Sequence, residues 1–294
     1  MLALLRDHLH FAPALSVVRQ CAWLVILTVI FVPLEQLFPV YRRKIFCKSA
    51  AGDLAFYFIS GVVPHLLLVI PLSVVAYVAY HFVPWQLHAT VAGWPFWLRG
   101  LAAFVVADLG FYWGHRWAHE IPLLWRFHSL HHSPEQVYFL ISARAHPIDN
   151  VVIRICGLIP IYILGLGAPQ SVQGTLVATL LMLVVTVWGF FIHANIRWRL
   201  GPLEWLISTP GFHHWHHVRS EFRNCNYASM LPCWDWIFGT YHLPKHWPTA
   251  YGIEAELPSS VTGQLLYPLQ SPPPVNSPDP ARIEPVRIKS SSSS

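Results

Sequence analysis

Three short histidine clusters are the part of this sequence whose residue types and spacing suit chemistry. Of the 18 histidines in 294 residues, eleven lie between residues 115 and 217. The clusters read GHRWAHE, FHSLHH and FHHWHH, and most of their histidines recur three or four positions apart. On a helix, such offsets place side chains on one face, about 6 Å apart along the axis. The eight histidines with this spacing are His115, His119, His128, His131, His132, His213, His216 and His217.

Clustered imidazoles of this kind indicate a metal site. Without a cation, eight buried rings would be costly to desolvate, and they would repel one another once protonated. Neutral imidazole is a common ligand of iron, copper and zinc, so a bound cation makes the same arrangement favourable. Isolated histidines such as His65, His81 and His88 are expected instead to be ordinary core or interface residues.

The supply of histidines predicts two metal ions rather than one. One ion takes about four to six ligands, and the clusters offer eight, or nine with His193 of FFIHANIRW. The carboxylates nearby are few, and they do not recur at ligand spacing: Asp108, Glu120, Glu135 and Asp149. Hydrolytic two-metal sites usually include bridging carboxylates, so an all-histidine pair favours redox chemistry.

The chain that must position these histidines has the composition of a multi-pass membrane protein. Charged residues make up 11% of the sequence, against about 25% in average soluble domains. No Asp, Glu, Lys or Arg occurs in residues 54–98 or in residues 155–196, and one span needs about 20 apolar residues. We therefore expect an all-α fold, a multi-pass membrane helical bundle.

The expected spans bring the histidine clusters to one side of the membrane. Spans are predicted within residues 11–38, from residue 54 into the seventies, and at 96–113, and residues 151–192 predict a hairpin that returns to the side it left. The loop after the first span reads YRRKIFCK, and short loops rich in Lys and Arg stay on the cytoplasmic side. The clusters are therefore expected in a helical cap on the cytoplasmic side.

Four stretches carry a family resemblance. In order, they read DLGFYWGHRWAHEIPLLWRFHSLHHSPE, HANIRW, TPGFHHWHH and NYASMLPCWDWIFGTYH. Together they resemble the fatty acid hydroxylase/sterol desaturase superfamily, whose members are integral membrane, non-haem di-iron enzymes that use dioxygen. The match covers residues 100–242. It implies a catalytic domain at 96–262. Composition separately predicts N-terminal spans and the basic loop at 1–95 and a tail at 263–294 that is Pro- and Ser-rich, and expected to be disordered, from about residue 271.

The resemblance also implies which side chains bind metal. The nine implied ligands are His115, His119, His128, His131, His132, His193, His213, His216 and His217. His214 occupies a position of the third cluster, FHHWHH, that varies in the family. There it either supports the ligands or replaces His213 among them. His146, Asp108 and Asp235 are candidates for orienting a ligand or a water, although a helix-start histidine, a cap or an ion pair has the same appearance in sequence.

The implied chemistry is oxidation of a lipid. Two iron (Fe) ions with O2 as co-substrate would hydroxylate or desaturate a C–H bond of a sterol, fatty acyl chain or related lipid, reached laterally from the bilayer. The chain lacks a GxGxxG nucleotide fingerprint. We therefore expect a separate electron-transfer protein as the electron donor: a reductase, a ferredoxin or a cytochrome. A net charge of +5, concentrated in the basic loop, predicts no nucleic-acid partner. The expected location is a bacterial inner membrane, or the endoplasmic reticulum in a eukaryote.

Two other classes of protein fit histidine clusters in a membrane. A zinc-type hydrolase or isomerase would use the same rings to activate water, and its turnover would not need dioxygen. A metal transporter would place its ligands near the middle of the membrane, whereas these clusters flank the ends of the expected spans.

Overall fold

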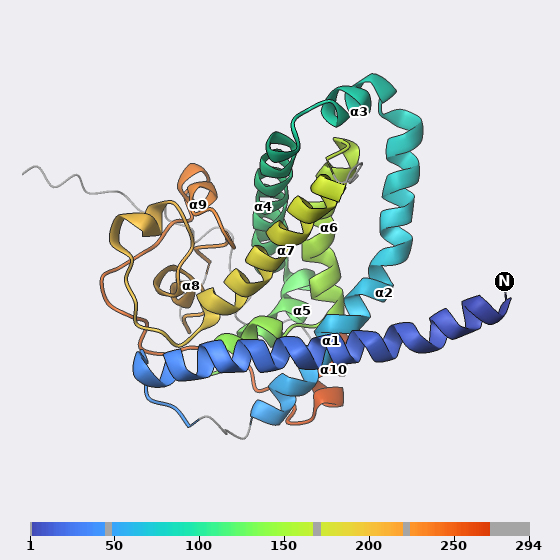
Figure 1. Cartoon of the computed structure of the whole chain (residues 1–294). Coiled ribbons are helices and arrows are strands. Elements are labelled where there is room, and N and C mark those ends of the chain that lie inside the picture. Colours follow the sequence, from blue (N-terminus) through green and yellow to red (C-terminus); the bar gives the residue numbers. More distant parts are fainter. Residues whose placement is uncertain (1, 45–48, 167–171, 220–223, 271–294) are drawn as a thin grey trace, which may run out of the picture.

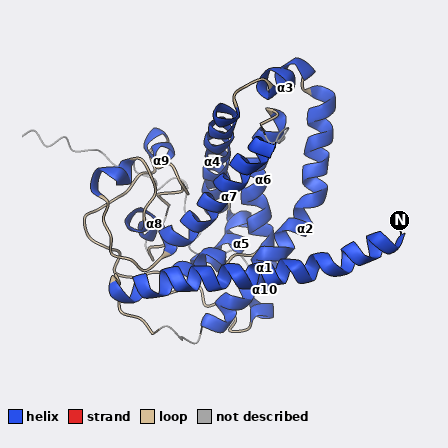
Figure 2. Cartoon of the chain, in the orientation of Figure 1, coloured by secondary structure: helices blue, strands red, loops and turns tan. Residues whose placement is uncertain are grey.

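The computed structural model describes residues 2–44, 49–166, 172–219 and 224–270. Over these residues the regular structure is helical, with one isolated bridge between Val218 and Tyr251 (Figure 2). This confirms the predicted all-α fold. The helices are α1 (Leu2–Leu37), α2 (Ala50–Phe82), α3 (Trp85–Ala92), α4 (Phe96–Glu120), α5 (Pro122–His132), η1 (Phe139–Ala143), α6 (Pro147–Ile163), α7 (Val172–His193), η2 (Gly201–Trp205), α8 (Pro210–His216), α9 (Cys233–Ile237) and α10 (Val261–Gln270).

Three of the described helices are long and apolar enough to cross a membrane. They are Ser16–Leu37 within α1, Ala50–Phe82 (α2) and Phe96–Glu120 (α4). Large apolar side chains such as Val69, Ile70 and Tyr80 lie exposed on α2, as lipid-facing residues do. The chain is therefore a membrane protein, and the three predicted spans correspond to these helices.

The helices form a bundle with the histidine-bearing segments at one end. Helices α2, α4 and α6 lie roughly along one axis in Figure 1, α7 is inclined to them, and α3 lies at one end of this group. Helix α1 runs across the opposite end, although its composition suits a span. The last residue of α4 (Glu120), the first residue of α6 (Pro147) and the last residue of α7 (His193) lie at the end of the bundle away from α3. Helices α5 and α8 lie at this same end.

Small residues let α4 and α6 approach very closely. A Cβ atom added to Gly110 would clash with the backbone oxygen of Cys156, and one added to Gly157 would make a tight contact, 3.1 Å, with that of Ala107. Only glycine fits at position 110, and small residues are typical of helix contacts inside membranes. This contact fixes α4 and α6 relative to each other, and with them His115 and Asp149.

Two buried carboxylates tie the first two helices to the irregular segments beside the histidines. Glu35 of α1 accepts hydrogen bonds from the backbone N–H groups of Phe139 and Asn195, at 2.8 and 2.9 Å. Asp53 of α2 pairs with Arg144 (Nη1–Oδ1 2.6 Å) and accepts the hydroxyl of Tyr138 at 2.5 Å. Both acids are almost fully buried. They therefore act as long-range anchors for the segments before α6 and after α7.

The predicted tail, residues 263–294, overlaps one helix among the described residues. Residues 261–270 form α10, which packs against the bundle through polar contacts and the buried Pro268. Gln264 Oε1 accepts from Arg144 Nη2 at 2.9 Å, and the backbone oxygen of Leu265 accepts from His146 Nε2 at 3.1 Å. The remainder of the predicted tail, residues 271–294, lies outside the described residues.

Candidate metal centre

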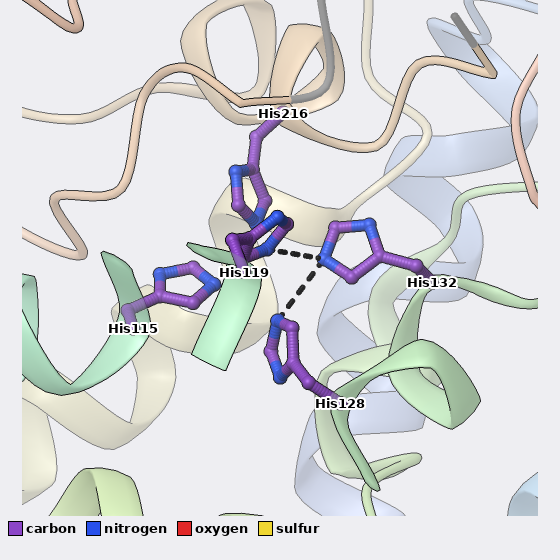
Figure 3. Close-up of side chains that lie close together, drawn as sticks. All are labelled: His115, His119, His128, His132 and His216. Carbon is purple, nitrogen blue, oxygen red and sulfur yellow. Dashed lines mark hydrogen bonds between the residues drawn. The ribbon is translucent and has the colours of Figure 1, made fainter. Parts of the chain in front are cut away.

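The nine predicted ligands gather into two groups. In each group, one ring nitrogen per histidine lies within 4.8 Å of the others, as the ligands of one ion would. The first group, drawn in Figure 3, is His115, His119, His128, His132 and His216. The second group is His131, His193, His213 and His217. We call them the five-histidine group and the four-histidine group.

Four helices supply these rings through the spacing seen in the sequence. His115 and His119 lie one turn apart near the end of α4, and the HSLHH segment forms the last turns of α5. Helix α8 carries the third cluster; it begins at Pro210, and its N-cap Thr209 accepts the N–H of Phe212 at 3.3 Å. His193 is the last residue of α7. The histidines at i, i+3 and i+4 therefore divide between the two groups.

The two groups adjoin each other. The rings of His132 and His217, one from each group, stack with centroids 4.4 Å apart, and those of His213 and His216, again one from each group, are 5.0 Å apart. Every one of the nine rings is at most 7% exposed. The site is thus one buried block of imidazoles with two ligand-sized subdivisions.

Burial favours the neutral form of at least five of these rings. Desolvation first, and then the neighbouring imidazoles, hold the pKa values of several rings well below that of a free histidine. The rings of this kind outside the membrane-spanning helices are His131, His132, His213, His216 and His217. Neutral imidazole is the form that binds metal.

Hydrogen bonds to Nδ1 fix which ring nitrogen faces the groups. Four rings donate Nδ1–H to a backbone oxygen, which can only accept: His115 to Tyr227 (2.8 Å), His131 to Arg144 (3.1 Å), His193 to Gly189 (2.6 Å) and His216 to Cys225 (2.8 Å). The Nε2 atom of each neutral ring then carries a lone pair and no proton. Outer partners of this kind are usual for metal-binding histidines.

The residues present fit metal ions by this criterion. The Nε2 atoms of His131 and His193 lie 3.2 Å apart, and both rings carry their proton on Nδ1. Two lone pairs therefore face each other, an arrangement that a cation between them would stabilise. The Nε2 atom of His216 is buried without a hydrogen-bond partner among the described residues, which is unfavourable for a polar atom unless something binds it.

The four candidate supporting residues lie outside both groups. His214 donates Nε2–H to the backbone oxygen of Ala194 (3.0 Å) and accepts the hydroxyl of Tyr251 at Nδ1 (2.9 Å). Both of its ring nitrogens are thus engaged, and His213 is the neighbour that joins a group. Because Ala194 follows His193, His214 holds the backbone that carries that ring. His146 instead caps α6 by accepting the N–H of Ile148 (3.1 Å).

The two candidate aspartates organise the segment after the third cluster. Asp235 accepts the N–H groups of Tyr227 and Ala228, at 2.8 and 2.9 Å, and the hydroxyl of Thr240 at 2.6 Å. Burial raises the pKa of Asp235 to about 6. Since the Tyr227 carbonyl accepts from His115, Asp235 supports that ring through one peptide unit. Asp108 accepts the N–H of Leu231 and the indole N–H of Trp234, both at 3.0 Å.

Asp149 supports the site directly, a role that the sequence did not indicate. Its carboxylate accepts from Nδ1 of His128 at 3.0 and 3.1 Å, and both residues are buried. The two residues are 21 positions apart on different helices, and no local spacing marks the pair. The only signal is an acid in the first turn of the helix that starts at Pro147.

Removing this carboxylate is expected to weaken metal binding at the five-histidine group. Asp149→Ala should lower metal affinity by roughly 10–100-fold, because loss of an outer partner frees the ring and its tautomer. Asp149→Asn keeps an acceptor oxygen and should lose less. Chelator competition measures the affinities, and Glu120→Gln, which lies in the partly exposed pair with Arg116, is the control. Equal affinity of Asp149→Ala and the unmodified protein would contradict the assigned role.

A cavity of about 240 Å³ opens beside both groups. Histidines of both groups line it, together with an apolar wall and a few polar side chains. The apolar wall includes Phe104, Phe111, Ile153, Val185, Ile192 and Met230, from α4, α6 and α7 and from the segment after α8. An apolar pocket that ends at the imidazoles suits a hydrocarbon ligand.

Comparison with known proteins agrees with this architecture. Residues 100–240 match the family described as fatty acid hydroxylase, and this segment holds all nine histidines of the two groups. This match confirms the resemblance to the fatty acid hydroxylase/sterol desaturase superfamily that the histidine clusters indicate. No solved structure gives a significant match to the chain.

Among individual proteins, the chain is similar to lipid hydroxylases and monooxygenases. It is 35% identical over 196 residues to ornithine lipid hydroxylase OlsE of Rhizobium tropici, covering 66% of this chain and 57% of that protein. It is 34% identical over 177 residues to alkylglycerol monooxygenase of Danio rerio (59% and 35%), and 35% identical over 153 residues to that of Homo sapiens (52% and 32%). The chain thus spans little more than half of the first relative and about a third of the others.

Proposed function

We propose that this protein is an O2-dependent di-iron oxidoreductase that hydroxylates a C–H bond of a membrane lipid. The observation that carries the proposal is the pair of adjoining groups of buried imidazoles at the end of an apolar cavity, five of which have their Nδ1 atom engaged by a carbonyl or carboxylate oxygen. The names of the relatives, a lipid hydroxylase and monooxygenases, support hydroxylation rather than desaturation. The nine histidines of the two groups are the proposed ligands.

Redox chemistry suits this site better than hydrolysis. No carboxylate belongs to either group, and imidazole ligands stay neutral through changes in the oxidation state of a metal. When bound, iron supplies the activation of dioxygen and the attack on an unactivated C–H bond. The overall reaction is R–H + O2 + 2 e⁻ + 2 H⁺ → R–OH + H2O. The electrons come from a separate reductase, ferredoxin or cytochrome.

The chain's own residues hold the rings and shape the substrate site. Asp149 and four backbone carbonyls keep each proton on Nδ1, so that Nε2 remains a ligand atom. The aromatic and aliphatic wall of the cavity binds the hydrocarbon and excludes water from the reacting carbon. The site lies at the cytoplasmic ends of the spans, as the basic residues Arg42, Arg43 and Lys44 suggest. The proposed membrane is a bacterial inner membrane, or the endoplasmic reticulum of a eukaryotic host.

An oxygen-isotope experiment tests the proposal. The purified, iron-loaded protein is incubated in lipid nanodiscs with an artificial electron donor under ¹⁸O2, and the lipid products are measured by mass spectrometry. One ¹⁸O atom per product is expected, with no product under nitrogen. Label from H2¹⁸O or turnover without O2 would indicate a hydrolase or isomerase. Iron flux across a sealed vesicle without lipid product would indicate a transporter, and either result overturns the proposal.

A further inference from the structure

One charged side chain in the cavity has no use in the site described so far. Asn150, Ile153 and Arg154 share one face of α6, at i, i+3 and i+4, and all three line the cavity together with the histidines. Arg154 is partly buried on this apolar helix. A cation placed among apolar side chains of a membrane protein is unfavourable unless something pairs with it, and such residues commonly mark binding sites.

The other charged groups that line the cavity already have partners. Asp149 accepts from His128, and Asp108 accepts from backbone and indole N–H groups after α8. By contrast, Arg154 makes no hydrogen bond and no ion pair with any residue that the structure describes. Asn150 donates its Nδ2–H to the hydroxyl of Ser60 at 3.2 Å. The cavity therefore presents one unengaged cation with five N–H donors.

We propose that Arg154 binds an anionic oxygen group of the lipid substrate, a phosphate or a carboxylate. The planar guanidinium matches either group with two parallel hydrogen bonds. The neutral histidines add no negative charge that would compete for Arg154. The inference names the substrate class of the proposed lipid hydroxylase. Only the oxidation of the bound lipid, and not its binding at Arg154, rests on the proposed function.

The position of Arg154 also restricts where the substrate is oxidised. Arg154 follows Asp149 by five residues, or about 7.5 Å along the helix, and Asp149 contacts the ring of His128. The cavity, at about 240 Å³, is smaller than the roughly 300–1,000 Å³ of sites that enclose a drug-sized ligand. An anionic group bound at Arg154 would therefore bring the first carbons of its chain beside the histidines that line the same cavity.

Binding measurements test this site independently of turnover. The full-length protein, treated with chelator and held in phosphatidylcholine nanodiscs, is titrated with dodecyl phosphate, dodecanoate and dodecanol below their aggregation concentrations. We expect one of the two anions to bind at least about tenfold more tightly than dodecanol, which corresponds to about 1.4 kcal/mol. The tighter of the two distinguishes phosphate from carboxylate as the group recognised.

Two substitutions at Arg154 and one matched control make the test specific. Arg154→Gln should bind the preferred anion about tenfold more weakly and leave dodecanol binding unchanged, and Arg154→Lys should fall between it and the unmodified protein. Arg19→Gln, an arginine on the exposed side of α1 and outside the cavity, should bind as the unmodified protein does. If Arg154→Gln unfolds, anion binding by Arg154→Lys is compared with that of the unmodified protein instead, because lysine retains the positive charge but not the paired N–H donors of arginine.

Several outcomes would overturn the proposal. They are equal binding of the anion by Arg154→Gln and the unmodified protein, a preference of the unmodified protein for dodecanol, and anion binding that occurs only with metal present. The last result would assign the anion to the metal centre instead of Arg154. Because none of these measurements needs turnover, anion binding at Arg154 stands even if the isotope experiment rejects an oxygenase.

Discussion

Replacing one histidine of each group should empty that group of metal and abolish turnover. His131→Ala removes a ring of the four-histidine group and His216→Ala removes one of the five-histidine group. We expect the unmodified protein to bind about two iron ions per chain, one for each group. Each variant should lose most of the iron of its own group, and product formation should fall below detection, since both groups border one cavity. Elemental analysis and product assay measure the two effects.

The control for this experiment is a histidine outside both groups. His81 lies near the exposed end of α2, where its ring contacts Tyr77 and Tyr80. His81→Ala should keep its iron and its activity. All three variants should insert into the membrane and retain their helical circular dichroism, because the spans do not depend on these rings. Near-normal product formation by His131→Ala or His216→Ala would reject the ligand assignment, and a copper-only protein would reject iron.

Breaking the buried ion pair between Asp53 and Arg144 should strongly destabilise the protein. Asp53→Ala leaves the buried guanidinium of Arg144 without its carboxylate and the Tyr138 hydroxyl without its acceptor. Removal of one partner from a buried pair lowers the free energy of unfolding by about 3–5 kcal/mol. Because the backbone oxygen of Arg144 orients His131, the variant should also bind metal more weakly at the four-histidine group. Unfolding in mild detergent and chelator competition check these two expectations.

A double variant and an exposed pair sharpen this prediction. Replacing both partners, Asp53→Leu with Arg144→Met, removes the isolated charge, so the double variant should be more stable than Asp53→Ala. Glu120→Ala breaks the half-buried pair of Arg116 and Glu120, one turn apart on α4, and should cost at most about 1 kcal/mol. A loss of stability in Asp53→Ala no larger than in Glu120→Ala would contradict the anchoring role of Asp53.

The sequence predicts the helical fold and the participants of the site because both depend on local periodicity. Apolar runs without charge mark most of α2 and all of α7, and spacings of three and four residues place His128, His131 and His132 on neighbouring positions of one helix. The count of histidines also anticipates two groups. What the periodicity does not reveal is how one cluster is shared: His131 belongs to one group, and His128 and His132 belong to the other.

Features that join distant parts of the chain could not be predicted in this way. The contact of Asp149 with His128 and the bonds of Glu35 to Phe139 and Asn195 depend on how helices meet, and no local spacing encodes them. In sequence, Glu35 only weakens the apolar character of the first span. Helix α10 was missed for a similar reason, because a short segment beside a Pro-rich stretch is stabilised mainly by its contacts with Arg144 and His146.

Four of the histidine rings have main-chain oxygens as partners, and this affects which mutations can disturb the candidate metal centre. Tyr227, Arg144, Gly189 and Cys225 each contribute a carbonyl, and any amino acid placed there brings the same atom. A substitution scan would therefore detect the histidines and Asp149. It would not detect the carbonyl oxygens, although these set which ring nitrogen carries the proton. The carbonyl contacts therefore survive a change of side chain at these four positions, whereas other contacts of those side chains, such as the ion pair of Arg144 with Asp53, do not.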